Sequence, residues 1–251
     1  MYPILFHIGP ISVYSYGFML VLAFVISTSL AKQKAKKEGI SPDLIVNLST
    51  YLLLGGIAGA RLLYVFLNIE EYRKTPLQIF MLQRGGLSFY GGMLGGFLAG
   101  FLFVRKYKLS LVKTADFISP YLALGQAIGR IGCFLRGCCY GKETSFFLRV
   151  RFPDEVVFRH PTELYASLLN FFIFLFLYHS YKNKYFAGET FLIYLMLYSL
   201  KRFLLDFLRG DLPPIYFNLT IFQILSIFVF FLALSLFFYK RKKIFYEKKG
   251  I

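Results

Sequence analysis

The chain has 251 residues, of which 57% are hydrophobic, with 31 Phe, 19 Tyr and no Trp. This composition is too apolar and too aromatic for a water-soluble domain of that length. The formal net charge of +16 would fit a nucleic-acid-binding protein only if the basic residues shared one folded face, whereas here they separate apolar segments. We therefore expect a membrane-embedded protein that binds no nucleic acid.

Seven segments are apolar enough to form spanning helices, each of which needs about 20 residues. Basic residues follow the first, third and fifth segments and fill the C-terminal tail, and none precedes the first segment. By the positive-inside rule these basic connections face the cytoplasm, so the N-terminus lies outside and the C-terminus inside. The seven segments are 11–31, 44–68, 86–104, 116–135, 162–180, 189–208 and 218–239.

The first segment lacks a basic leading region and ends in a lysine run, so we interpret it as a retained span rather than a signal peptide. No internal repeat or linker divides the chain. The sequence therefore predicts an all-α integral membrane protein, with residues 1–251 forming a single polytopic domain of about seven transmembrane helices.

Glycines recur at small-xxx-small spacing in the second, third and fourth segments, as in the pairs Gly55 and Gly59, Gly91 and Gly95, and Gly125 and Gly129. Such spacing lets helix backbones approach closely in a bilayer. We expect most of these glycines to serve helix contacts.

The one sizeable outside connection is 136–161, where apolar residues alternate with Arg149 and Arg151 before Pro153-Asp154. Alternation with period two, interrupted by a turn dipeptide, predicts a short β-hairpin. We expect this connection to form a small extracytoplasmic cap.

Three arginines fall within predicted spans: Arg61, Arg130 and Arg202. An ionisable side chain in a bilayer is costly and indicates a functional site. Asp206 lies four residues after Arg202 and can neutralise it on one helix face, and Arg209 lies further on, near the surface. Snorkelling or structural pairing would explain any single arginine equally well.

An excess of buried guanidinium groups over carboxylates requires an anion, and phosphate suits the planar fork of arginine. At the outer leaflet the abundant phosphate belongs to phospholipid headgroups. The sequence thus indicates a protein that binds a phospholipid through its phosphate, without specifying a reaction.

Other polar candidates are His160, at the start of the fifth segment, Tyr16 in the first and Tyr90 in the third. Helix capping accounts for much of the motif around His160. The two tyrosines suit either interfacial packing or contact with a phosphate.

Cys133, Cys138 and Cys139 lie in one run, CFLRGCC. This spacing matches no zinc pattern with two separated pairs, and three cysteines are an odd number for disulfides. We expect small packing residues here, with no metal and no cofactor; one disulfide near the outer surface is the alternative.

The motif GRIGCFLRGCCYG at 129–141 resembles the signature of the bacterial prolipoprotein diacylglyceryl transferases. Five further motifs support the resemblance in chain order. They are SYG at 15–17, GARLLYVFLN at 59–68, RGGLSFYGG at 84–92, RHPTELY at 159–165 and KRFLLDFLRGD at 201–211.

The resemblance implies transfer of the diacylglyceryl group of phosphatidylglycerol to the lipobox cysteine thiol of a prolipoprotein signal peptide, with release of glycerol phosphate. It implies that Arg130 and Arg202 hold the phosphate and stabilise charge as the ester bond breaks, and that Arg209, Asp206 and Tyr16 occupy functional or structural positions. The expected site also includes Tyr90 as a catalytic candidate, and Arg61 and His160 as substrate-binding candidates. The expected protein is a monomeric, multi-pass enzyme of the bacterial cytoplasmic (inner) membrane.

Many family members carry His where this chain has Tyr90, and Asn and Glu where it has Cys133 and Cys138. Because tyrosine has a pKa of about 10, either arginine charges generate the substrate thiolate or the chain is a divergent relative. Two alternatives therefore stay open: an enzyme with another lipid or acceptor, and a non-catalytic lipid-binding or transport protein. Transport predicts interrupted helices in two repeats, which the sequence lacks, so an enzyme is favoured.

Overall fold

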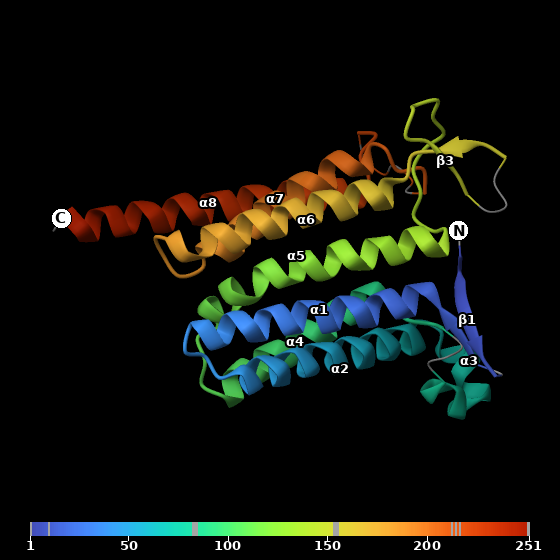
Figure 1. Cartoon of the computed structure of the whole chain (residues 1–251), viewed down its shortest axis with the longest axis horizontal. Helices are drawn as coiled ribbons and strands as arrows, with labels where there is room; N and C mark the ends of the chain where they lie inside the picture. The colour runs from blue at the N-terminus through green and yellow to red at the C-terminus, as the bar shows by residue number, and fades with distance from the viewer. Residues whose placement is uncertain are drawn as a thin grey trace. The chain divides into compact units, whose positions relative to one another are not determined.

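The computed structural model describes residues 2–9, 11–81, 85–152, 156–211, 213, 215 and 217–249, and it is mainly α-helical (Figure 1). The chain divides into two compact units. One consists of Met1–Ser27 and Ala115–Ile251 and the other of Thr28–Thr114, and each is described by itself.

Long helices occupy all seven apolar segments predicted from the sequence. Among the described residues, four helices are long and apolar enough to cross a membrane, namely Ser15–Lys37, Pro42–Leu67, Thr162–Asn183 and Ile221–Tyr246. The prediction of an all-α membrane protein is confirmed at this level. The seven long helices are α1 (Ser15–Lys37), α2 (Pro42–Leu67), α4 (Phe89–Lys106), α5 (Leu111–Arg136), α6 (Thr162–Ser180), α7 (Glu189–Asp206) and α8 (Ile221–Lys249).

The N-terminus forms a β-hairpin that the sequence interpretation missed. Strands β1 (Ile4–Ile8) and β2 (Ile11–Tyr14) pair antiparallel, with Phe6 opposite Val13. The first helix therefore begins at Ser15, whose backbone N–H donates to the Pro3 carbonyl at 2.9 Å. The predicted start at residue 11 was wrong because hydropathy alone does not separate an apolar strand from the helix that follows it.

In the unit Thr28–Thr114, α2 and α4 pack directly against each other through glycine. A Cβ atom added to Gly59 would lie 2.7 Å from the Gly95 Cα atom, and one added to Gly55 would lie 2.8 Å from the Gly95 carbonyl oxygen. Only glycine permits this backbone approach. The expected helix contact of the second and third segments is confirmed. Two short helices follow α2: α3 (Ile69–Lys74) and the 3-10 helix η1 (Pro76–Phe80).

In the other unit, the glycines of α5 face α1, where a Cβ atom added to Gly132 would lie 2.9 Å from that of Met19. The start of α7 is fixed by the buried carboxylate of Asp116 on α5, which accepts hydrogen bonds from the Gly188 and Phe191 amides at 2.7 and 3.0 Å. An acidic side chain at a helix N-terminus satisfies amides that lack intrahelical partners. Asp116 thereby fixes α7, which carries Arg202, relative to α5, which carries Arg130.

Between α5 and α6, strands β3 (Val150–Arg151) and β4 (Phe158–Arg159) pair antiparallel. The predicted hairpin is confirmed, while its Pro153-Asp154 turn lies outside the described residues. The 3-10 helix η3 (Tyr181–Asn183) ends α6. Helices α7 and α8 run side by side in Figure 1, joined by a core of Phe186, Leu192 and Ala233.

Candidate functional site

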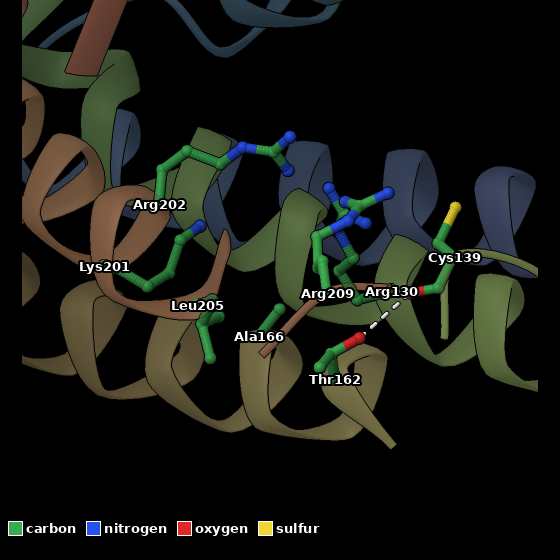
Figure 2. Close-up of a pocket in the computed structure, with 8 residues that line it drawn as sticks. All are labelled: Arg130, Cys139, Thr162, Ala166, Lys201, Arg202, Leu205 and Arg209. Atoms are coloured by element: carbon green, nitrogen blue, oxygen red, sulfur yellow. Dashed lines mark hydrogen bonds between the residues drawn. The ribbon is translucent and has the colours of Figure 1, made fainter. Parts of the chain in front are cut away.

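A small pocket rich in positive charge lies between α5, α6 and α7 (Figure 2). Four of its eight lining side chains are basic, and they come from two helices and the turn that ends α7. The lining residues are Arg130, Cys139, Thr162, Ala166, Lys201, Arg202, Leu205 and Arg209.

Arg130 is the side chain in this pocket whose charge is left uncompensated. It projects from the last two turns of α5, and within the part of the chain that the structure describes it has no hydrogen bond or ion pair. Arginine stays protonated in proteins. A permanent cation without an internal partner, in a pocket among apolar helices, favours a bound anion.

Arg202 and Arg209 are each paired with a carboxylate. Arg202 Nε lies 3.1 Å from Oδ1 of Asp206, one turn later on α7, and its guanidinium stacks over the Phe222 ring. Arg209 donates to both carboxylate oxygens of Asp211, at 2.9 and 2.6 Å. The expected pairing of Arg202 with Asp206 is confirmed, and it holds Arg202 in place at the pocket.

Lys201 is a pocket residue that the sequence interpretation missed. It is 7% exposed, and its Nζ donates to the Asn170 side-chain oxygen on α6 at 2.7 Å. The signal was present, because a lysine inside an apolar span is as costly as an arginine. The interpretation of the motif at 201–211 considered Arg202 and overlooked its neighbour Lys201.

The loop after α5 is tied to α6 and α7 through its backbone. Thr162 donates from its hydroxyl to the Cys139 carbonyl at 2.9 Å, and the Lys142 amide donates to the Leu208 carbonyl at 2.7 Å. A Cβ atom on Gly141 would lie 2.8 Å from both the His160 and the Leu208 carbonyl oxygens. Glycine is therefore required at 141, where the loop passes between these two segments.

This loop also gathers the three cysteines. The Sγ atoms of Cys133, Cys138 and Cys139 all lie within 4.8 Å of one another. Hydrogen bonds with Cys133 and then Cys138 lower the pKa of the Cys139 thiol, and the charges of Arg209 and Arg130 lower it further. Although packing was expected for these cysteines, Cys139 lines the pocket.

Two other predicted residues lie close to this site without lining it. Tyr16, in the first turn of α1, stacks under the Arg136 guanidinium at 5.9 Å and lies within electrostatic range of Cys133 and Arg130. His160 Nδ1 lies 3.4 Å from the Tyr165 hydroxyl, and its carbonyl accepts from the Gly141 amide. The structure thus brings together Arg130, Arg202 and Arg209, with Tyr16 and His160 in neighbouring positions.

Arg61 and Tyr90 belong to the unit Thr28–Thr114. The Arg61 guanidinium is buried and donates to five backbone carbonyls after α2, those of Gln78, Ile79, Met81, Gly85 and Gly86. Since an arginine has five N–H donors, these bonds favour a structural role over the predicted substrate contact. Tyr90 lies in the first turn of α4, is 46% exposed and packs edge-to-face on Phe89.

Comparison with known proteins gives consistent matches along the chain. The sequence model of the prolipoprotein diacylglyceryl transferase family matches residues 3–239. A phosphatidylglycerol–prolipoprotein diacylglyceryl transferase of Clostridium tetani is 32% identical over 242 residues, covering 94% of this chain and 97% of the relative. Proteins of the same name from Nostoc sp. and Staphylococcus aureus (strain Newman) are 35% identical over 223 residues and 30% over 251, covering 83% and 96% of this chain and 79% and 90% of the relatives.

Proposed function

We propose the roles below from one premise: the chain belongs to the prolipoprotein diacylglyceryl transferase family. The protein is a transferase that moves the diacylglyceryl group of phosphatidylglycerol to prolipoproteins. Its catalytic site, in our proposal, is the pocket between α5, α6 and α7. The observation that carries the proposal is Arg130, a half-buried cation that has no hydrogen bond or ion pair among the described residues and lies beside three further basic side chains.

The reaction we assign to this pocket forms a thioether. The thiolate sulfur of the lipobox cysteine attacks the glyceryl carbon that bears the phosphate, so that a carbon–sulfur bond forms and the carbon–oxygen bond breaks. The bonding electron pair leaves with the phosphate oxygen, and glycerol phosphate departs with one more negative charge than the phosphodiester carried. Fixed cations in a water-poor site stabilise such developing charge best.

Within this scheme Arg130 and Arg202 hold the phosphate and stabilise the leaving group. Arg209, which lies near Arg130 in Figure 2, binds the headgroup as well, while Tyr16 and His160 border the substrate. We leave Arg61 out of the ligand set, since backbone carbonyls occupy its donors. Tyr90 remains a candidate base in this proposal.

The arrangement of the chain in the membrane is also part of our proposal. We infer one domain, since α1 runs unbroken through the boundary between the two compact units. We infer seven spans, an outside N-terminus, a cytoplasmic C-terminus, a cap at 136–161, and a monomer in the bacterial inner membrane. The seven long helices and the basic connections support this topology. A fluorescent protein fused after residue 251 should fluoresce and alkaline phosphatase fused there should be inactive; the opposite pattern refutes the orientation.

The test of function is turnover by purified protein in detergent, with phosphatidylglycerol and a lipobox peptide. We expect the peptide to gain the mass of one diacylglyceryl group and glycerol phosphate to appear in equal amount. Both products should form at least about a hundredfold more slowly in Arg130→Ala and at the wild-type rate in Arg149→Ala, which removes an exposed arginine from the connection after α5. Lipid binding without either product would refute catalysis and leave a binding protein or an enzyme with another acceptor.

A further inference from the structure

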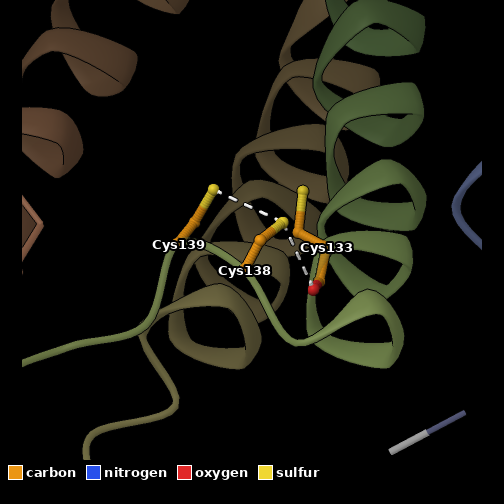
Figure 3. A group of neighbouring side chains, drawn as sticks. All are labelled: Cys133, Cys138 and Cys139. Atoms are coloured by element: carbon orange, nitrogen blue, oxygen red, sulfur yellow. Dashed lines mark hydrogen bonds between the residues drawn. The ribbon is translucent and has the colours of Figure 1, made fainter. Parts of the chain in front are cut away.

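The thiols of Cys133, Cys138 and Cys139 lie close together beside the pocket, and none of the roles proposed above involves them. Their sulfur atoms lie within 4.8 Å of one another, and those of Cys138 and Cys139 are 3.7 Å apart. Figure 3 shows the three side chains directing their sulfur atoms to one region between the end of α5 and the loop. All three are half-buried and none forms a disulfide.

These separations match those of sulfur atoms that share a metal ion. Zinc binds thiolate sulfur at about 2.3 Å, so two sulfurs at tetrahedral angles lie about 3.8 Å apart. The sulfur atoms of Cys138 and Cys139 already have this spacing, and the other two pairs need a shift of no more than about 1 Å. Although the spacing of the cysteines in the sequence matches no zinc pattern, a sharp loop brings their sulfur atoms together. Cys139 itself has φ of 69°, in the left-handed region that non-glycine residues rarely occupy.

An unpaired carboxylate in the same neighbourhood also indicates a cation. Glu163, which follows Thr162 at the start of α6, is 1% exposed, and neither of its carboxylate oxygens has a hydrogen-bond partner among the described residues. It interacts electrostatically with Cys139 and also with Arg130 and Arg209, none of which bonds to it. A buried carboxylate in this state is costly unless a counter-charge lies near it.

The surrounding charges suit a divalent ion held by sulfur. Three thiolates and one Zn²⁺ sum to a single negative charge, and Arg130 and Arg209 act electrostatically on Cys139 from the pocket side. Thiolates also select thiophilic ions over magnesium or calcium. The arginines therefore stabilise the occupied site rather than repel the ion.

We propose that Cys133, Cys138 and Cys139 bind one Zn²⁺ ion through their thiolates, and that its fourth position binds and activates the lipobox cysteine thiol of the substrate. Three protein ligands with one open position is the arrangement of catalytic zinc sites. The inference rests on the proposed function, and it supplies the thiol-activating group that Tyr90 provides poorly.

The step balances without an oxidant or a further reactant. The substrate thiol binds zinc and releases its proton to water, because a coordinated thiol is deprotonated. Its sulfur then attacks the glyceryl carbon, and the electron pair of the carbon–oxygen bond leaves with glycerol phosphate held by the arginines. A free thiol with a pKa of about 8.5 is about 3% ionised at pH 7, so coordination raises the reactive fraction up to about thirtyfold.

The first test measures metal directly. Protein purified without a metal-affinity tag, supplied with Zn²⁺ and then desalted, should contain about one zinc per chain by mass spectrometry. Cys133→Ser, Cys138→Ser and Cys139→Ser should each lower this content, and Tyr140→Phe, the control next to Cys139, should retain it. Cobalt added to metal-free wild-type protein should give a thiolate charge-transfer band, a measurement that needs no variant to fold. Wild-type protein without zinc and without this band, or with a disulfide among the three cysteines, overturns the proposal.

The second test separates this inference from the proposed function. Removing zinc with a chelator should slow lipobox peptide modification at pH 7 by up to about thirtyfold, and Zn²⁺ should restore it. The rate of the metal-free protein should also climb with pH up to the thiol pKa, while that of the zinc-loaded protein stays nearly level. Full activity of metal-free protein overturns the zinc site and leaves the transferase intact. No product from zinc-loaded protein overturns the proposed function itself.

Discussion

Replacing Arg130 by alanine should remove a ligand-binding group without destabilising the fold. Arg130 has no partner among the described residues, so its removal leaves no internal group unsatisfied. Arg202→Ala is different, because Asp206, which is 3% exposed, would keep only the Thr220 hydroxyl at 3.2 Å. The two variants should therefore both lose activity but differ in stability.

The magnitudes follow from these contacts. A hydrogen bond to a charged group contributes about 1.5–3 kcal/mol, so losing the Arg130 fork should cost at least about 3 kcal/mol of transition-state stabilisation. That loss is roughly a hundredfold in kcat/KM. Breaking a buried ion pair by removing one partner costs about 3–5 kcal/mol of folding free energy, so Arg202→Ala should also unfold at a clearly lower temperature.

The assay measures kcat/KM for phosphatidylglycerol and the unfolding temperature in the same detergent. Arg149→Ala is the control, as it removes one exposed positive charge without touching the pocket. The reasoning fails if Arg130→Ala keeps wild-type kcat/KM. It also fails if Arg130→Ala lowers the unfolding temperature as much as Arg202→Ala does.

Three further predictions concern the unit Thr28–Thr114. Arg61→Ala should lower the unfolding temperature and expose α3 and η1 to limited proteolysis, since five carbonyls lose their donor; a raised KM with unchanged stability would instead make Arg61 a substrate ligand. Gly95→Ala should destabilise the protein by about 1–3 kcal/mol through overpacking against Gly59, measured by thermal unfolding, whereas Gly96→Ala, with 3.6 Å of room, should not. Tyr90→Phe should leave lipobox peptide turnover unchanged, and a large loss would identify Tyr90 as the base.

The helical framework was predictable because hydropathy and glycine spacing act locally. An apolar run of about 20 residues forms a helix in a bilayer whatever its neighbours are. The N-terminal hairpin was not predictable in this way, since its strand Ile11–Tyr14 is continuous in hydropathy with the helix after it. Its pairing depends on residues 4–8, which no local pattern distinguishes from a short tail.

The arginines of the pocket and the local pairing of Arg202 with Asp206 were predictable, whereas the lack of a partner for Arg130 was not. The cost of a buried arginine identified Arg130 and Arg202 from sequence alone. Whether a basic side chain of the pocket has a partner can depend on contacts between helices. An example is the hydrogen bond from Lys201 on α7 to Asn170 on α6. Arg61 carried the same sequence signal as Arg130, and only the surrounding carbonyls distinguish a structural arginine from one available to a ligand.

The positive charge of the pocket should stabilise the departing glycerol phosphate more than the bound phosphatidylglycerol. Asp206 and Asp211 pair with Arg202 and Arg209, while Arg130 has no ion pair among the described residues and interacts with the Glu163 carboxylate only at a distance. Phosphatidylglycerol brings one negative charge to this site, whereas released glycerol phosphate carries about 1.5 to 2 at neutral pH. The positive charge of Arg130 therefore interacts more strongly with the departing group than with the bound lipid. Such differential binding accelerates a reaction, since only interactions that strengthen toward the transition state lower the barrier.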